Sequence, residues 1–343
     1  MDTPFRRVYA RSELAREEIA LPAQTHRLIA LYALLLLANV CAWLWARMLF
    51  WHEPVLMGMA TLAYGLGLRH AMDADHIAAI DNVTRQLLHN GEKPITVGFY
   101  FSLGHSTVVM LVCAALAETA IHLRGSFAVM SSVGGLVGGS ISVTLLLVLA
   151  FANFSTLRSS WPVRRNHGEA QASERGGILS RILRPLTSLV HHPWQAYPLG
   201  FLFGLGFDTA TEVGLLGVSV SASHRISPWA IMVFPTLFAG GMVLIDTTQG
   251  VLANGAYGFA SIGRRHKVYN FVIGLYSAMA ALTVGSLEAL NLIGERFALT
   301  GAFWQRVSDL NDRTVALGYL ITGVLLSLWL FFALRSRLKW PAG

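Results

Sequence analysis

The sequence predicts an all-α membrane protein whose chain crosses the bilayer eight times. Of its 343 residues, 54% are hydrophobic and only 13% are charged, which is more apolar and poorer in charge than a typical soluble chain. Several apolar stretches are each long enough to cross a hydrocarbon core of about 30 Å as a helix. They lie near residues 28–50, 55–80, 95–118, 131–154, 198–221, 228–254, 269–293 and 315–334.

The second stretch, 55–80, is the least certain of these spans because its later part carries a charged run. It crosses the membrane only if those charged residues face the protein interior, so seven spans are the alternative. The distribution of lysine and arginine among the loops decides between eight and seven spans. Nineteen of these basic residues lie in the termini, in the loops after the second and sixth spans and in segment 155–197, against six in the other loops. Basic loops stay in the cytoplasm, so we expect both termini to be cytoplasmic, which requires an even number of spans.

Segment 155–197 is polar, basic and broken by three prolines, and it separates two groups of four spans. We expect it to be a cytoplasmic linker. The other divisions are an N-terminal cytoplasmic segment, two membrane regions and a cytoplasmic tail, at 1–27, 28–154, 198–334 and 335–343. We expect no cleaved leader peptide, since a long polar and mixed segment precedes the first span.

A glycine pattern suggests that the two membrane regions are related. Gly65-Leu66-Gly67 in the second span matches Gly204-Leu205-Gly206 in the fifth, and these two spans run in opposite directions. This is typical of an inverted repeat, here of spans 2–4 and 5–7, in which interrupted helices meet at a substrate site. Glycine is frequent in all membrane helices, so a chance match is the equal alternative.

Charge and cysteine content exclude other classes of protein. The net charge of +7 is spread over loops rather than gathered in one patch with aromatic residues, so we expect no nucleic-acid partner. Cys41 and Cys113 both lie in apolar runs, so neither a disulfide framework nor a cysteine metal site is expected.

The run Arg69-His70-Ala71-Met72-Asp73-Ala74-Asp75-His76-Ile77 places two carboxylates, two imidazoles and a guanidinium inside an apolar stretch. Each charge at the centre of a bilayer costs roughly 2.5–3.5 kcal/mol, so it is kept only where it faces a partner, a cavity or a substrate. On one continuous helix Arg69, His70, Asp73 and His76 share a face, whereas Asp75 points away.

Imidazole and carboxylate donors together suit a divalent first-row ion such as Ni²⁺ or Co²⁺. We expect Arg69 to be a counter-charge for an acid such as Asp75 or Glu212. A polar packing cluster or a proton relay without metal is the alternative.

Three further spans add polar groups at membrane depth. His105 lies in Gly104-His105-Ser106-Thr107 of the third span, where ordinary helix–helix hydrogen bonding is an equal alternative to metal binding. Asp208 and Glu212 share a face of the fifth span, and Asp246 lies in the sixth, one turn after Met242, which we expect to be packing. Five deep acids must line an inner cavity, and such a cavity selects cations.

These four motifs, at 69–77, 104–107, 205–212 and 241–246, resemble those of the nickel/cobalt transporter family of bacterial permeases. The resemblance covers nearly the whole chain. It implies a multi-pass protein of the bacterial cytoplasmic membrane that takes up Ni²⁺, Co²⁺ or both as substrate, and neither an enzyme nor a cofactor-dependent protein. His70, Asp73, Asp75 and His76 are central to the metal site in this resemblance. We expect His105, Asp208, Glu212 and Asp246 to be further metal-site groups.

No ATPase subunit is expected, because a divalent ion entering a negative cytoplasm gains about 4.6 kcal/mol per 100 mV. Coupling to a proton gradient is open, as are the choice between nickel and cobalt, the oligomeric state and the metalloenzyme that receives the metal. An exporter is the alternative, although the 155–197 segment holds only His167, His191 and His192 for metal collection. An intramembrane metalloenzyme is less compatible, since the chain has no His-Glu-x-x-His motif.

Overall fold

The computed structural model describes residues 4–119, 126–159, 190–206, 210–222, 226–261 and 267–337. In these ranges the chain is helical and contains no strand, which confirms the predicted all-α class. The helices are α1 (Pro4–Phe50), α2 (Pro54–His70), α3 (Ala74–His89), α4 (Val97–Thr119), α5 (Ser126–Ser159), a 3₁₀ turn (Pro193–Gln195), α7 (Ala196–Phe203), α8 (Ala210–Ala222), α9 (Pro228–Ile231), α10 (Val233–Ser261), α11 (Lys267–Arg296), α12 (Ala302–Asn311) and α13 (Thr314–Arg337). Most of the predicted linker, residues 160–189, lies outside the described ranges.

Six helices in the described ranges are long and apolar enough to cross a membrane. They are Thr25–Phe50, Val97–Ala117, Gly135–Phe154, Pro228–Gly258, Val268–Arg296 and Thr314–Leu334. These six match six of the predicted spans. The other two predicted spans, 55–80 and 198–221, are the ones that the structure divides into shorter helices: α2 and α3, and α7 and α8.

The expected single helix through the charged run is wrong, because the helix stops at His70 and restarts at Ala74. Asp73 immediately precedes α3 with extended backbone angles of φ −64° and ψ 142°. No glycine or proline lies at the break, so tertiary contacts determine it: Gln249 of α10 donates to the Ala71 carbonyl at 3.0 Å, and Thr314 donates to Asp73 at 2.9 Å. The charged residues therefore lie at a junction between two helix ends.

Helix α10 is the central element of the bundle and packs against α1, α2, α3 and α4. Helix α4 also packs against α7. The two backbones approach closely because each helix has a glycine at the contact. A Cβ added to Gly104 would collide with the Tyr197 carbonyl, and one added to Gly200 would collide with that of Phe101. This close contact holds His105 of α4 next to the end of α7.

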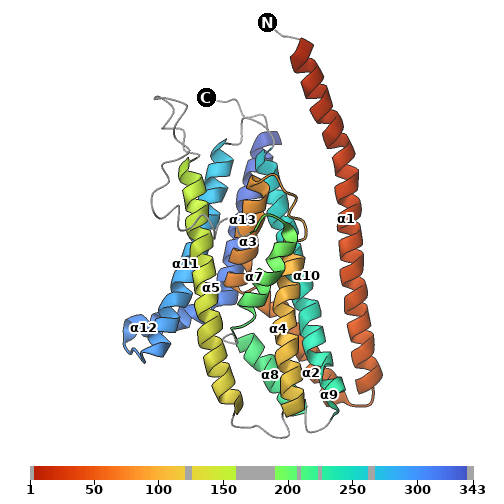
Figure 1. Cartoon of the computed structure of the whole chain (residues 1–343), viewed down its shortest axis with the longest axis vertical. Helices are drawn as coiled ribbons and strands as arrows, with labels where there is room; N and C mark the ends of the chain where they lie inside the picture. The colour runs from red at the N-terminus through yellow and green to blue at the C-terminus, as the bar shows by residue number, and fades with distance from the viewer. Residues whose placement is uncertain are drawn as a thin grey trace.

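Figure 1 shows an elongated bundle in which α2 and α3 follow one another along its length, as do α7 and α8. The start of α1 and the end of α13 lie at the same end of the bundle, where α3 also ends. Helix α1 runs along one side and exposes large apolar side chains such as Leu37 and Met48. Such an apolar outer surface is what a lipid-facing helix presents.

Candidate metal centre

Three histidines from two parts of the chain come together in the interior. His70 ends α2, His76 lies in the first turn of α3 and His105 lies in α4. Their ring centroids are 4.5 to 4.9 Å apart, and one donor atom from each lies within 4.8 Å of the others. All three are buried, with exposed fractions of 1%, 0% and 2%. The three imidazoles, all of them expected metal-site groups from the sequence, are thus close enough together that they could hold one metal ion.

Two aspartates orient two of these imidazoles. His70 Nδ1 donates to Asp73 Oδ2 at 2.9 Å, and His76 Nδ1 donates to Asp246 Oδ2 at 3.1 Å. A carboxylate on one ring nitrogen places the proton there and leaves a lone pair on the other nitrogen for a metal. His76 Nε2 has no hydrogen-bond partner in the structure. Asp73 and Asp246 thus orient the imidazoles of His70 and His76.

The next residue of the centre is Glu212, in the first turn of α8. Its Oε1 lies 3.0 Å from His105 Nε2 and 3.8 Å from His70 Nε2, and the two Nε2 atoms are 3.1 Å apart. Two donors on one ion with bonds of about 2.1 Å are about 3.0 Å apart at a right angle, so these separations fit a shared cation. A cation accepts a lone pair from all three atoms, which a single proton cannot do. We call His70, His76, His105, Asp73, Asp246 and Glu212 the histidine cluster.

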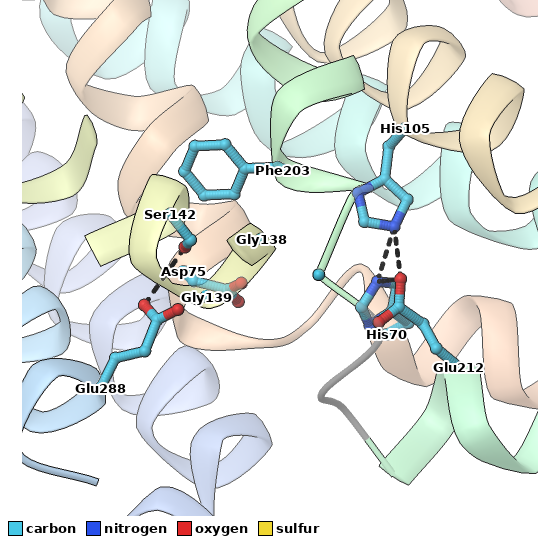
Figure 2. Close-up of a pocket in the computed structure, with 10 residues that line it drawn as sticks. His70, Asp75, His105, Gly138, Gly139, Ser142, Phe203, Glu212 and Glu288 are labelled. Carbon is cyan, nitrogen blue, oxygen red and sulfur yellow. Dashed lines mark hydrogen bonds and ion pairs between the residues drawn. The ribbon is translucent and has the colours of Figure 1, made fainter. Parts of the chain in front are cut away.

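A cavity of about 10 Å³ adjoins the histidine cluster. Figure 2 shows His70, His105 and Glu212 on one side of it and Asp75, Ser142 and Glu288 on the other. Asp75 therefore lines the same space as His70, rather than pointing away from it as a continuous helix would require. The break at 71–73 accounts for the difference.

Three other residues of the sequence motifs, Arg69, Asp208 and Met242, lie outside the histidine cluster as the structure describes it. Arg69 is exposed and forms no ion pair with an acid in the described ranges, so its expected role as counter-charge to Asp75 or Glu212 is wrong. Asp208 lies outside the described residues. Met242 is fully buried in the apolar core, in agreement with the expected packing role.

Sequence reasoning missed two acids of the bundle interior, of which Glu288 is half-buried and Asp81 is buried. Glu288 lies within the apolar span Val268–Arg296, so the rule that found the other deep acids would also have found it. Asp81 lies further along α3, where its carboxylate accepts hydrogen bonds from Tyr257 at 2.7 and 2.8 Å and from Ser277 at 2.5 Å. We call Asp81, Tyr257 and Ser277 the Asp81 cluster.

The histidine cluster can bind one divalent transition-metal ion through nitrogen and carboxylate oxygen. Neutral imidazole and carboxylate together favour ions such as Ni²⁺, Co²⁺ and Zn²⁺ over Mg²⁺, which prefers oxygen alone. Since no thiol lies among the cluster residues, Cu⁺ is disfavoured.

Comparisons with known proteins agree with this chemistry. The family described as high-affinity nickel-transport protein matches residues 56–335. A high-affinity nickel transport protein of Cupriavidus necator is 45% identical over 91% of this chain and 92% of its own length. The hydrogenase nickel incorporation protein HupN of Bradyrhizobium diazoefficiens is 43% identical over 90% of this chain and 83% of its own. The cobalt transport protein NhlF of Rhodococcus rhodochrous is 34% identical over 83% of this chain and 84% of its own length. No solved structure matches the chain.

Proposed function

Because this chain belongs to the high-affinity nickel-transport protein family, we propose that it is a permease that imports Ni²⁺, Co²⁺ or both across the bacterial cytoplasmic membrane. The observation that carries the proposal is the buried histidine cluster between the ends of α2 and α3. A transition-metal ion is the substrate that matches its donors. The chain is a membrane transport protein and not an enzyme.

In this proposal, His70, His76 and His105 are the nitrogen ligands, and Glu212 supplies an oxygen. Asp73 and Asp246 keep the lone pairs of His70 and His76 directed at the ion. Asp75 lines the adjoining cavity and Asp208 is assigned to the same path from its sequence motif. The carbonyl end of α2 also favours this placement, because its partial negative charge attracts a cation.

We also propose eight spans, with α2–α3 and α7–α8 as two interrupted ones that run in opposite directions (Figure 1). Two interrupted helices beside a buried site are typical of inverted-repeat transporters and support a repeat of spans 2–4 and 5–7. The end of the bundle that carries the start of α1 and the end of α13 is assigned to the cytoplasm, since the basic loops belong to it.

We propose that the membrane potential, or a proton gradient, drives uptake without an ATPase subunit. A divalent ion gains about 4.6 kcal/mol per 100 mV on entering a negative cytoplasm, which supports roughly thousandfold accumulation.

The test is accumulation of radiolabelled Ni²⁺ in cells that express the chain, compared with His70→Ala and with excess Co²⁺, Zn²⁺ or Mn²⁺ as competitor. We expect accumulation that His70→Ala abolishes and that Co²⁺ suppresses more strongly than Mn²⁺. Absence of accumulation, or faster loss of preloaded metal, would contradict import and favour an exporter.

A further inference from the structure

The cavity beside the histidine cluster has a second wall made of oxygen donors. Asp75 comes from the first turn of α3, Ser142 from α5 and Glu288 from α11. Ser142 Oγ donates to Glu288 Oε2 at 3.2 Å. Figure 2 shows these three side chains together, across the cavity from His105. Three helices thus contribute to one small polar wall.

Two polar atoms, each on a residue that lines this cavity, are buried without a hydrogen-bond partner. They are Asp75 Oδ1 on the oxygen wall and His105 Nδ1 on the opposite side, on a side chain that is only 2% exposed. A buried polar atom without a partner costs about 1–3 kcal/mol, so it persists where a ligand pairs with it. Asp75 Oδ1 is an acceptor that a cation can pair with directly. His105 Nδ1 carries the proton when Nε2 binds a metal, so it can donate to a water molecule of the same ion.

Phe203 and three glycines form the rest of the cavity lining. Gly138 and Gly139 of α5 and Gly206 after α7 line the cavity. A Cβ on Gly138 would collide with the backbone of Gly206, so the α5 backbone itself closes the cavity there. The volume of about 10 Å³ is close to what one water or one small ion needs.

We propose that Asp75, Glu288 and Ser142 form an oxygen-only binding station for a divalent cation, next to the histidine cluster. This inference rests on the proposed transport function. The two carboxylates carry the charge that balances one divalent ion, and oxygen donors bind an ion that keeps part of its water shell. The imidazoles then replace oxygen and water ligands one at a time, so the ion never crosses the cavity without ligands.

The test compares Glu288→Gln with Glu295→Gln, which lies on the same helix α11 but is exposed and accepts a hydrogen bond from Asn291. The initial rate of Ni²⁺ uptake is measured against Ni²⁺ concentration. The melting temperature of the detergent-extracted protein is measured with and without Ni²⁺. We expect Glu288→Gln to raise KM by about tenfold or more, a usual effect of losing a carboxylate at a metal site.

Because the histidine cluster is intact in Glu288→Gln, we expect Ni²⁺ still to raise the melting temperature of this variant. Glu295→Gln should match the wild type, and Glu288→Asp, which keeps the carboxylate, should recover much of the uptake. A wild-type KM in Glu288→Gln would overturn the oxygen station. So would loss of both uptake and Ni²⁺-induced stabilisation that Glu288→Asp does not restore, because that result indicates a structural role. If the wild type itself takes up no Ni²⁺, the transport proposal fails instead.

Discussion

Helix α3 contributes to two buried polar clusters, the histidine cluster and the Asp81 cluster, which differ in whether their polar atoms are paired. Both oxygens of Asp81 accept hydrogen bonds from Tyr257 or Ser277, so the Asp81 cluster is complete without a ligand. In the histidine cluster, His76 Nε2, His105 Nδ1 and Asp246 Oδ1 lack partners. Buried polar atoms in folded proteins are nearly always paired, so we infer that the Asp81 cluster holds helices together and the histidine cluster holds a substrate.

The largest effect is expected from removing a nitrogen atom of the histidine cluster that has no hydrogen-bond partner, His76 Nε2. In His76→Asn the amide nitrogen can keep the hydrogen bond to Asp246, but the Nε2 donor is lost. We expect Ni²⁺ uptake to fall about a hundredfold or more, to background. Wild-type protein should gain about 2.7 kcal/mol of stability at a Ni²⁺ concentration of 100 Kd, and the variant should gain none. Normal uptake by this variant would remove His76 from the ligands.

A smaller effect is expected when an orienting carboxylate loses its charge. Asp246→Asn can still accept the hydrogen bond of His76, but it polarises the imidazole less. We expect KM for Ni²⁺ to rise by about 10–100-fold. Asp309→Asn, at an exposed position on α12, is the control and should leave KM unchanged. If the two variants behave alike, Asp246 does not support the site.

The Asp81 cluster should respond in stability and not in affinity. Tyr257→Phe removes the hydroxyl that donates to Asp81, and we expect a loss of about 1.5–3 kcal/mol in the free energy of unfolding. KM for Ni²⁺ should stay at its wild-type value in the protein that remains folded. Tyr319→Phe, on an exposed face of α13, is the matched control. A changed KM with an unchanged melting temperature would mean that the Asp81 cluster takes part in transport.

The smallest effect is expected at Arg69, which belongs to the same sequence motif as the histidines but is exposed. Arg69→Gln should leave Ni²⁺ uptake unchanged and should not lower the free energy of unfolding, because Arg69 forms no ion pair with an acid in the described ranges. Initial uptake rates and thermal melting measure both quantities. Strong loss of uptake would restore a direct role for this guanidinium.

The sequence predicts the long helices and most of the site well, because both depend on local composition. Apolar length identifies the six uninterrupted spans, and the high cost of charge in a membrane identifies His70, His76, Asp246 and Glu212 as interior groups. Pairings between distant residues, such as His105 with Glu212, follow from the packing of α4 against α8 and have no local signal.

The break between α2 and α3 could not be predicted for a related reason. Ala71 and Met72 are good helix formers, and Asp73 before Ala74 is the only local sign of a new helix start. The contacts that hold the break open come from Gln249 and Thr314, which are far away in sequence. The error about the direction of Asp75 follows directly from this missed break.

The same break has a mechanical consequence. Helix α2 rests against α8, whereas α3 rests against α5, α11 and α13, and α10 touches both. A continuous rod would have to tilt as one body, so any movement at one membrane face would be transmitted to the other. Two helices joined by the three residues 71–73 can instead tilt independently about that joint. We therefore expect that one of the two helices can move at its own membrane face while the other keeps its contacts.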